Sequence, residues 1–300
     1  MMNVFVIIVT FNGMQWYEKC FSSLRRSTIP IKTIVVDNAS TDGTIDFIRN
    51  KFPEIILIES KENLGFGKGN NLAMRYAIEH SCDYVFLINQ DTWIDPDTIE
   101  RLINIHRCHT EFGILSPIHL NADRTEIVAQ IGLGNGFRND KFLSDLYCNK
   151  LKELYPTNYV NAAAWLLPRK TLEIVGGFDP IFVHYEEDDN YINRVIYHKL
   201  KIGICPFVQI VHDHKDSALS NEKILIRRHQ NLLVEWTNIN KPFSFMRYFL
   251  HYLKKCVSAL LTYNSVKQNV SFDELLYLIK NRKGIINSRL QSSKNSPSWL

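Results

Sequence analysis

The ten residues VVDNASTDGT (residues 35–44) decide the fold that we expect for this chain. The apolar residues that lead into this segment predict a buried strand, and Asp37 follows directly at the end of that strand. A carboxylate in that position is placed to accept hydrogen bonds from a nucleobase or a ribose hydroxyl. The polar residues 40–42 predict the cap of a helix, so we interpret Asp42 as structural.

The same alternation of a short apolar run with a helical stretch extends to both sides of this segment. The apolar runs cover residues 4–9, 33–36, 55–59 and 84–88, and the stretches with helical spacing cover 15–26, 43–51 and 67–80. Continuous apolar runs are typical of strands that helices cover on both faces. We therefore expect an α/β fold with a mostly parallel, twisted sheet over residues 1–240, and ligands at the carboxyl ends of its strands.

Polar clusters follow all four expected strands. Thr10 and Asn12 follow the first strand, Asp37 the second, Asn63 the third and Asp91 the fourth. Turn and capping chemistry explains any one of these clusters, but four clusters at one edge favour a ligand site. A carboxylate that meets diphosphate oxygens and water is a common way to hold Mg²⁺ or Mn²⁺, and Asp91 is the candidate ligand.

The segment NLGFGKGNN (residues 63–71) holds three glycines just before a helical stretch. Glycine lets a backbone approach a ligand closely, so Gly65, Gly67 and Asn70 are candidates for donor binding together with Asn63. The segment is not a Walker A loop, because no Lys-Ser/Thr pair closes it, and the GxGxxG spacing is absent. The glycine-rich residues 132–136 predict a loop or hairpin, because no strand-to-helix context surrounds them.

Four consecutive acids, residues 186–189, open a stretch with helical spacing. The helix dipole favours one or two acids in a first turn, by about 0.3–1 kcal/mol each, but four neighbouring acids repel one another. A bound cation or a proton-transfer role would account for this repulsion being tolerated. Glu187 and Asp188 are therefore catalytic candidates, since an acceptor hydroxyl must lose a proton as it attacks.

Two further segments contain residues for which the sequence permits either a structural or a functional role. An apolar strand leads into His212 and His214, whose spacing places them on one face and permits a contact with a metal or a diphosphate. Trp165 lies in an apolar segment, where a tryptophan is most often part of a core. An aromatic ring can also stack on a sugar ring, which is the alternative for Trp165.

The charge distribution separates the chain into two parts. Residues 241–300 hold ten Lys/Arg and two Asp/Glu, which gives +8, and the remaining 25 and 29 give −4. The acidic body argues against nucleic-acid binding, and the basic, aromatic-rich helical extension 241–300 favours peripheral contact with an anionic membrane. Packing of its aromatics on the body or on a second subunit is the alternative. Six scattered cysteines and the lack of a long apolar run predict a cytoplasmic protein.

The order of VTFNG, VVDNASTDGT, NLGFGKGNN, NQDT, GGFDPIF, EED and VHDH over residues 3–215 resembles family 2 glycosyltransferases, in particular the bacterial rhamnosyltransferase-like branch. The resemblance implies a GT-A fold as the catalytic domain. It places Thr10 and Asp37 at the nucleobase and ribose and residues 65–70 beside the donor. It also makes Asp91 the retained acid of a DxD-like metal motif.

For the chemistry, the resemblance implies that Asp188 of the Glu187-Asp188 pair is the base and that His212 lies at the metal or diphosphate. The expected reaction is inverting, metal-dependent transfer of a hexosyl or rhamnosyl group. The sugar moves from a nucleotide-diphosphate donor to a hydroxyl of a glycan or lipid-linked acceptor, in cell-envelope polysaccharide synthesis. Two departures from the family pattern stand out: Asn89 replaces the first acid of the DxD motif, and Asn190 replaces an acid two residues after the base.

Two rival functions share some of these features. A nucleotidyltransferase has a similar core, but it would show a glycine-rich loop with Arg and Lys after the first strand, which residues 10–13 lack. A non-catalytic module that binds nucleotides or carbohydrates would not need the Glu187-Asp188 pair. We therefore expect an enzyme.

Overall fold

The computed structural model describes residues 2–128, 140–213, 221–261 and 265–300. In the first part of the chain, strands and helices alternate as the sequence predicts, and each expected element lies within two residues of its predicted bounds. These elements are β1 (Val4–Thr10), α1 (Met14–Arg25), β2 (Lys32–Asp37), α2 (Thr44–Lys51), β3 (Ile56–Glu59), α3 (Gly65–Glu79) and β4 (Tyr84–Ile88).

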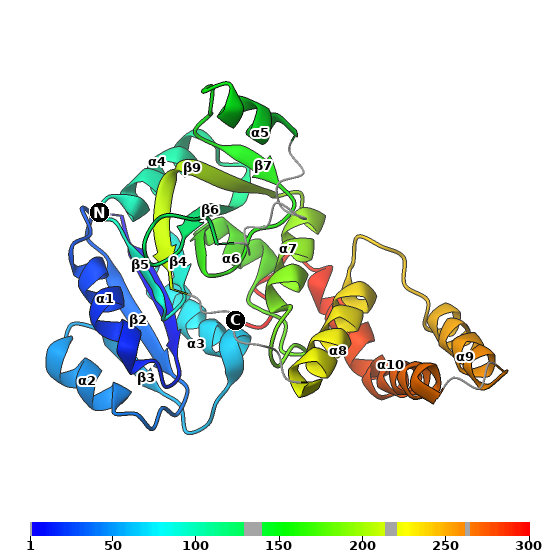
Figure 1. The fold of residues 1–300 in the computed structure, drawn as a ribbon. Helices are drawn as coiled ribbons and strands as arrows, with labels where there is room; N and C mark the ends of the chain where they lie inside the picture. The colour runs from blue at the N-terminus through cyan, green and yellow to red at the C-terminus, as the bar shows by residue number, and fades with distance from the viewer. Residues whose placement is uncertain (1, 129–139, 214–220, 262–264) are drawn as a thin grey trace.

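The second part adds strands of both directions and the C-terminal helices (Figure 1). Its elements are β5 (Thr92–Ile94), α4 (Thr98–Cys108), β6 (Phe112–Leu120), α5 (Asp140–Tyr147), β7 (Tyr155–Thr157), β8 (Ala164–Pro168), α6 (Arg169–Val175), α7 (Glu187–Tyr197), β9 (Lys201–His212), α8 (Asn221–Thr237), α9 (Phe245–Leu261) and α10 (Ser265–Ser292). The expected loop at residues 132–136 and His214 lie outside the described residues.

The described strands form one sheet in the order β3-β2-β1-β4-β8-β6-β9-β5, and β7 pairs with β9. The strands β3, β2, β1 and β4 are parallel, which confirms the expected doubly wound half. The strand β8 then enters antiparallel between β4 and β6, so the other half of the sheet is mixed. This antiparallel entry brings the later segments of the chain to the carboxyl edge of β1, β2 and β4.

Helices cover both faces of the sheet because side chains of each strand alternate between two cores. In β1, Phe5 and Ile7 join a core with residues of α3, α6 and α7, whereas Val6 and Ile8 join a core with residues of α1 and α4. A strand that is buried on both faces is continuously apolar, which explains the unbroken runs of the sequence.

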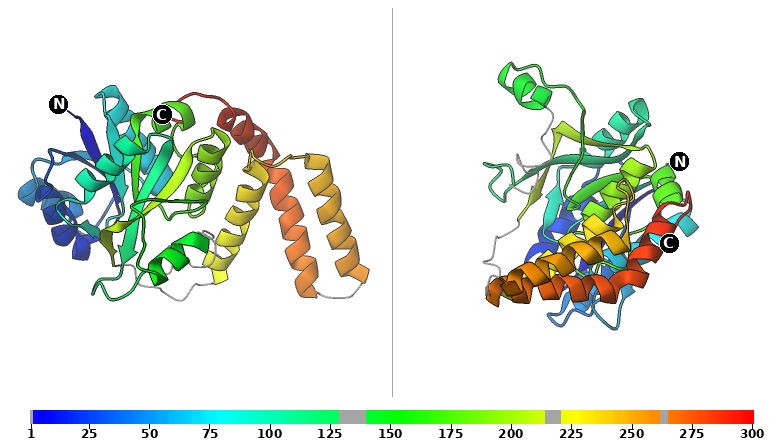
Figure 2. Two further views of the ribbon diagram at one scale, coloured as in Figure 1. Left: turned by 90° about the horizontal axis from the view of Figure 1, so that it is seen from above. Right: turned by 90° about the vertical axis from the view of Figure 1, so that its right-hand side faces the viewer.

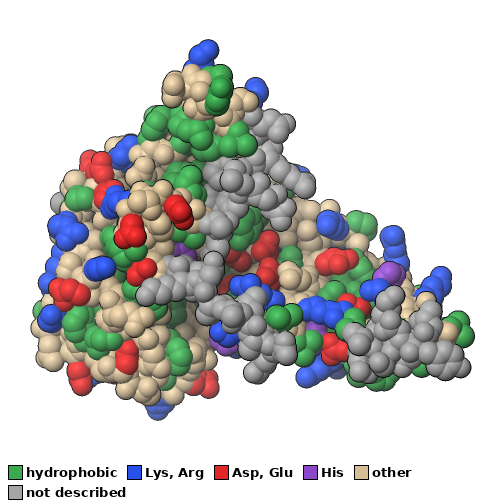
Figure 3. Space-filling view, in the orientation of Figure 1, with side chains coloured by type: hydrophobic (Ala, Val, Ile, Leu, Met, Phe, Trp, Pro, Cys, Tyr) green, Lys and Arg blue, Asp and Glu red, His purple; other side chains and the backbone are tan. Residues whose placement is uncertain are grey.

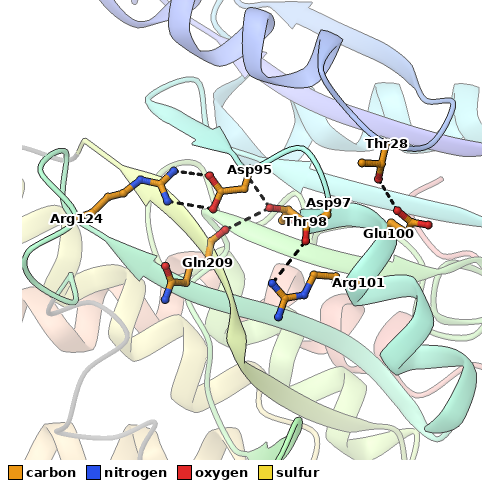
Figure 4. A network of polar contacts seen from close by, with 8 residues as sticks. All are labelled: Thr28, Asp95, Asp97, Thr98, Glu100, Arg101, Arg124 and Gln209. Carbon is orange, nitrogen blue, oxygen red and sulfur yellow. Dashed lines mark hydrogen bonds and ion pairs between the residues drawn. The ribbon is translucent and has the colours of Figure 1, made fainter.

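A polar network anchors β5, which directly follows Asp91 (Figure 4). Asp95 accepts two hydrogen bonds from the guanidinium of Arg124, at 3.0 and 2.6 Å, and its backbone N–H donates to Thr98. The hydroxyl of Thr98 in turn donates to the backbone oxygen of Gln209 in β9. Asp95 is therefore a structural residue that fixes the position of β5 against β9.

The C-terminal residues 296–300 return to the sheet domain and pack over a buried arginine of α7. Arg194 donates hydrogen bonds to the side chain of Asn190 and to two backbone oxygens of the loop after α6, at 3.1, 2.7 and 2.5 Å. Its guanidinium lies 4.7 Å from the ring centre of Trp299, and the backbone oxygen of Ser298 accepts a hydrogen bond from Gly177. Asn190 also donates to Thr237 of α8. The asparagine that stands where the family pattern has an acid therefore links α7 to α8.

We expect the substitution Arg194→Met to destabilise the fold by about 3 kcal/mol, because it leaves two buried backbone oxygens and Asn190 without their donor. Chemical denaturation measures the difference. Arg49→Met, which removes an exposed ion pair with Glu59, is the matched control, and we expect it to change the free energy of unfolding by less than about 1 kcal/mol. Equal effects of the two substitutions would contradict the assigned role of Arg194.

The helices α9 and α10 confirm the helical character that the sequence predicts for the C-terminal extension. They project away from the sheet, with α10 beside α8 and α9 on the far side of α10 (Figure 2). A third, smaller core joins them to α8 and to the loop before α7, and its buried residues include Phe182, Trp236, Tyr252 and Leu278. No helix within the described parts of the chain combines the length and apolarity that crossing a bilayer requires.

Candidate functional site

The carboxyl ends of β1 and β2 place Thr10 directly opposite Asp37 in the parallel register. Both residues are fully buried, and the hydroxyl of Thr10 donates to Oδ2 of Asp37 at 2.9 Å. Asp37 also accepts hydrogen bonds from the backbone and the hydroxyl of Ser40, at 2.9 and 2.6 Å. Thr10 therefore orients Asp37, and Asp37 shapes the turn that carries the neighbouring Asn38 to the edge of the sheet.

Asn12 joins the loop after β1 to the loop after β2. Its side-chain oxygen accepts a hydrogen bond from the backbone of Thr41 at 2.8 Å, and its backbone N–H donates to Ser40 at 3.0 Å. Asp42 accepts hydrogen bonds from Thr44 at the start of α2 and from the backbone of Met14 at the start of α1. The interpretation of Asp42 as a structural residue is therefore confirmed.

The glycine-rich segment forms the first turns of α3, where close packing explains two of its glycines. Gly65 has a φ of +77°, and a Cβ there would lie 2.6 Å from the backbone oxygen of Val183. A Cβ at Gly67 would lie 3.1 Å from Phe178, and Asn70 donates to the backbone oxygen of Phe66.

The described residues that line the cavities at this edge include Asn63 and Gly65, whereas Gly67 and Asn70 are not among them. Gly67 and Asn70 pack within the protein instead. A donor-binding role for these two residues therefore has no support in the geometry.

The first cavity has a volume of about 300 Å³ and opens at the ends of β1, β2 and β4. Its lining is polar at the strand ends and apolar at α3. The lining residues are Val9, Thr10, Phe11, Asn38, Asn63, Gly65, Phe66, Asn89, Gln90, Asp91 and His184. The candidates Thr10, Asn63, Gly65 and Asp91 thus meet at one cavity, as predicted from their positions at strand ends.

Asp91 and His212 lie together because β5 and β9 pair with Thr92 opposite His212. Oδ1 of Asp91 is 3.3 Å from Nε2 of His212, and the two side chains are 14% and 2% exposed. An octahedral ion with bonds of about 2.1 Å holds neighbouring ligand atoms about 3 Å apart, so this pair fits two positions around one cation.

Among the described side chains, no group of three or more His, Cys, Asp or Glu is arranged to hold a metal. The remaining ligands of a cation at Asp91 and His212 would therefore come from the donor diphosphate and water. Burial and the neighbouring His212 lower the pKa of the fully buried His119 to about 3, so this second imidazole stays neutral beside the pair.

The acid cluster begins with strained backbone. Tyr185 and Glu186 have φ values of +69° and +66°, and Glu186 is the residue that precedes the first turn of α7. Left-handed conformations of residues other than glycine cost about 1–3 kcal/mol each and persist where the surrounding structure enforces them. Two in succession place Glu187, Asp188 and Asp189 in the first turn of a helix at the wall of a cavity.

Asp188 is half-buried and held by two hydrogen bonds. The hydroxyl of Tyr159 donates to Oδ2 at 3.2 Å, and the backbone N–H of Asp189 donates to Oδ1 at 3.0 Å. Burial and the charge of Glu186 raise the pKa of Asp188, and burial with the charge of Asp188 raises the pKa of Asp189. Burial also raises the pKa of Tyr159, so its hydroxyl remains a donor to Asp188.

Glu187 is 7% exposed, and burial together with the charges of Asp188 and Glu186 raises its pKa to about 7. The raised value means that protonated Glu187 stabilises the fold at acidic pH. This contribution is lost as the pH rises from about 4.5 through about 7, when the buried carboxyl ionises.

We expect Glu187→Gln, which stays neutral, to be more stable than the natural chain by about 3 kcal/mol near pH 8, and by less than about 1 kcal/mol near pH 5. Thermal unfolding across this pH range measures the difference. Glu62→Gln, at an exposed position, is the control and should show no such dependence. A gain in stability of the same size at both pH values would contradict the ionisation of Glu187 as its cause.

The second cavity, of about 570 Å³, opens beside the acid cluster and adjoins the first, because Phe66 and Asn89 line both. Figure 3 shows acidic side chains in the hollow between the sheet domain and the C-terminal helices, with basic side chains close to them. The lining residues are Phe66, Asn89, Tyr159, Asn161, Ala162, Ala163, Tyr185, Glu186, Glu187, Asp188, Asp189, His212 and Arg227. His212 thus connects Asp91 in the first cavity with Asp188 in the second.

Trp165 corrects one expectation. The side chain is fully buried in β8 and packs against Phe178 and Tyr191, with ring centres 6.2 and 5.7 Å away. A side chain without exposed surface does not stack on an acceptor sugar. Trp165 is a core residue because β8 is a central strand whose inner face meets α6 and α7.

Tyr159 and Arg227 are among the polar residues of the second cavity that the sequence-based candidates do not include. Tyr159 lies in the loop before β8 and reaches Asp188, and Arg227 lies in α8 with its guanidinium 4.9 Å from the ring centre of Tyr185. Neither belongs to a local motif, so only the tertiary fold brings them to the acids. The arrangement as a whole places the Asp91–His212 pair at the junction of the two cavities and the basic Arg227 beside the acid cluster in the second.

This sheet edge combines a carboxylate–imidazole pair in one cavity with an acid cluster in the next, on a fold of the expected GT-A type. Comparison with solved structures supports the fold. The Staphylococcus aureus protein TarS, residues 1–349 in complex with UDP, aligns with a TM-score of 0.54 at 15% identity, over 97% of this chain and 90% of that one. Its complex with UDP-GlcNAc aligns with a TM-score of 0.55 at 14% identity and the same coverage.

Sequence comparison gives the family. Residues 5–141 match the family described as glycosyl transferase family 2. The low-salt glycan biosynthesis hexosyltransferase Agl10 of Haloferax volcanii is 25% identical over 69% of this chain and 66% of its own length. The dTDP-rhamnosyl transferase RfbF of Shigella flexneri is 21% identical over 72% and 71%. The chain is thus similar to family 2 glycosyltransferases, and it spans about two thirds of the length of these relatives.

Proposed function

We propose that this chain transfers a hexosyl or rhamnosyl group from a nucleotide-diphosphate sugar to a hydroxyl of a glycan or lipid-linked acceptor, with inversion at the anomeric carbon. The observation that carries the proposal is the pair of adjoining cavities, because one offers the Asp91–His212 pair and the other the half-buried acid Asp188. Similarity to an N-acetylglucosaminyl-diphospho-decaprenol L-rhamnosyltransferase of Mycobacterium tuberculosis, 24% identical over 63% of this chain and 69% of that one, supports a lipid-linked acceptor.

Asp91 and His212 would hold a divalent cation together with the donor diphosphate. A ligand set of carboxylate and phosphate oxygens together with an imidazole nitrogen suits Mn²⁺ better than Mg²⁺. Mg²⁺ prefers oxygen ligands only and retains several of its bound waters. When bound, such a cation neutralises the negative charge that grows on the departing diphosphate.

Asp188 would take the proton of the acceptor hydroxyl. In the proposed step, the bond from the hydroxyl oxygen to the anomeric carbon forms while the bond from that carbon to the diphosphate breaks, and the nucleoside diphosphate leaves. The raised pKa of Asp188 makes its carboxylate a stronger base than an exposed aspartate, and the hydrogen bond from Tyr159 fixes its orientation. A single displacement of this kind inverts the anomeric configuration.

Arg227 would bind the diphosphate from the side opposite to Asp91. Its guanidinium lines the second cavity and is held against the ring of Tyr185. A planar guanidinium offers two parallel donors to phosphate oxygens, and the ring restricts its motion before the donor binds.

We expect Arg227→Met to raise the KM for the donor by roughly tenfold with a smaller effect on kcat, because the loss of a charged hydrogen bond weakens binding by about 1.5–3 kcal/mol. Steady-state kinetics with the donor varied measures the change. The neighbouring residue supplies the control: Arg228 pairs with Glu274 of α10 at 2.6 Å, so Arg228→Met should leave the KM unchanged. An unchanged KM in Arg227→Met would remove Arg227 from the donor site.

A panel of nucleotide-diphosphate sugars tests the proposed reaction itself. Thermal unfolding with Mn²⁺ identifies the donor, because a ligand that binds only the folded chain raises its stability. Slow hydrolysis of that donor then separates an enzyme from a module that only binds. Stabilisation without any hydrolysis or transfer would favour the binding module and contradict the proposal.

A further inference from the structure

The helices α9 and α10 carry two rows of exposed apolar side chains that recur every three or four residues. The row on α9 consists of Met246, Leu250, Leu253, Val257 and Leu260, which are 59%, 47%, 40%, 49% and 61% exposed. The row on α10 consists of Phe272, Leu276, Ile279, Ile286 and Leu290, which are 57%, 51%, 46%, 41% and 59% exposed. So many exposed apolar side chains on two neighbouring helices mark an interaction surface.

The two rows lie on the same face of the helix pair. The helices run antiparallel, because Lys255 pairs with Glu274 and Arg282 stacks on Phe245 near the opposite end (Figure 2). Exposed residues of each row directly follow a buried one, as Leu253 follows Tyr252 in α9. The same order holds for Leu276, Ile279 and Ile286, which follow the buried Leu275, Leu278 and Ile285 of α10. Successive residues of an α-helix point about 100° apart, so each row is turned by about 100° from the buried side of its own helix. The turn has the same sense on both helices, and it brings the two rows to one face of the helix pair.

Basic side chains border this apolar face. Arg247 and Lys254 lie beside the row of α9, Lys280 lies beside the row of α10, and Lys283 falls within it, and all four are exposed. A second copy of the chain placed symmetrically on this face would bring like charges together. An anionic surface would instead attract every one of them, by about 1 kcal/mol for each residue near the membrane.

The helix α8 connects this face to the second cavity. Arg227 lines the cavity, whereas the next two residues, Arg228 and His229, contact Glu274 and Asp273 of α10 at 2.6 Å. If α10 were bound to a surface, the second cavity with its acidic residues would therefore lie close to that surface.

We propose that the exposed face of α9 and α10 docks on an anionic phospholipid surface. The apolar rows enter the boundary between headgroups and acyl chains, and the bordering Lys and Arg side chains contact the headgroups, as in helices that lie in the plane of a membrane. This inference goes beyond the proposed transfer reaction and does not depend on it.

Co-sedimentation of the full chain with vesicles tests the proposal. We expect binding to phosphatidylcholine vesicles that contain phosphatidylglycerol, and weak binding to phosphatidylcholine alone. The variant Leu250→Ser/Val257→Ser/Leu276→Ser/Ile279→Ser and the variant Arg247→Glu/Lys254→Glu/Lys280→Glu should each lose roughly tenfold or more in affinity. These side chains are exposed, so thermal unfolding should show that both variants fold.

Matched controls replace exposed residues elsewhere on the surface. Leu143→Ser/Leu146→Ser/Phe207→Ser removes side chains of similar exposure, and Lys61→Glu/Lys150→Glu/Lys152→Glu changes the charge equally. Both controls should bind vesicles as the natural chain does. Vesicle binding that is absent, or equal in all variants, would overturn the proposal. So would light scattering that shows a dimer which the apolar variant abolishes. Donor hydrolysis, measured without vesicles, should be the same in every variant, which separates this test from that of the reaction.

Discussion

The variant Asp188→Asn is expected to lose roughly a thousandfold in the rate of sugar transfer while it binds the donor almost as tightly as the natural chain. The amide keeps the size of the side chain, and its single oxygen can accept one of the two hydrogen bonds that Oδ2 and Oδ1 of Asp188 accept from Tyr159 and the Asp189 backbone. It cannot take a proton from the acceptor hydroxyl. Single-turnover kinetics at saturating acceptor measures the loss, and calorimetry measures donor affinity.

The neighbouring acid supplies the matched control for this prediction. Asp189→Asn leaves the carboxylate of Asp188 in place, so transfer should remain within roughly tenfold of the natural rate. In the natural chain, transfer should decline on the acid side as Asp188 becomes protonated, at a pH above the usual range of an aspartate because its pKa is raised. A thousandfold loss in Asp189→Asn with turnover retained in Asp188→Asn would reassign the base.

The variant Asp91→Ala is expected to weaken Mn²⁺-dependent donor binding by roughly 100-fold. Its carboxylate lies 3.3 Å from Nε2 of His212, and its loss leaves the cation with one protein ligand of the pair. Calorimetric titration with the donor, with and without Mn²⁺, measures the difference. We expect nearly equal affinities for the two chains when Mn²⁺ is absent.

Asp123→Ala, at an exposed position of the turn after β6, is the control for Asp91→Ala and should bind as the natural chain does. His212→Ala should weaken the Mn²⁺-dependent binding in the same way as Asp91→Ala. The loss of binding free energy in the double variant should be smaller than the sum of the losses in the two single variants, because both side chains would bind one ion. Full additivity, or donor binding that does not respond to Mn²⁺, would contradict a shared cation.

Local patterns were sufficient to predict the parallel half of the fold. The strands β1, β2 and β4 are buried on both faces, so their sequences are continuously apolar, and the polar residues that follow them mark the edge of the sheet. For that reason Thr10, Asn63, Gly65 and Asp91 could be assigned to one cavity from their positions alone.

The remaining parts of the site depend on packing that no local pattern encodes. Gly67 has sequence neighbours typical of a binding segment, but contact with Phe178 places it in the core, whereas Trp165, which also packs on Phe178, takes the core position that its apolar neighbours favoured. Tyr159 and Arg227 come from a loop and a distant helix, and they reach the acids only because β8 runs antiparallel and α8 packs beside α7. The exposed rows of α9 and α10 likewise become one face only through the antiparallel pairing of the helices.

The structure of Asp188→Asn crystallised with Mn²⁺ and the identified nucleotide sugar is the most direct test of the central claim, that the two adjoining cavities form one site. The account predicts Mn²⁺ bound by Asp91 and His212, the diphosphate spanning from this ion toward Arg227, and the anomeric carbon facing residue 188 across Phe66 and Asn89. A donor bound with its diphosphate away from Asp91, or with its sugar directed out of the second cavity, would contradict the account.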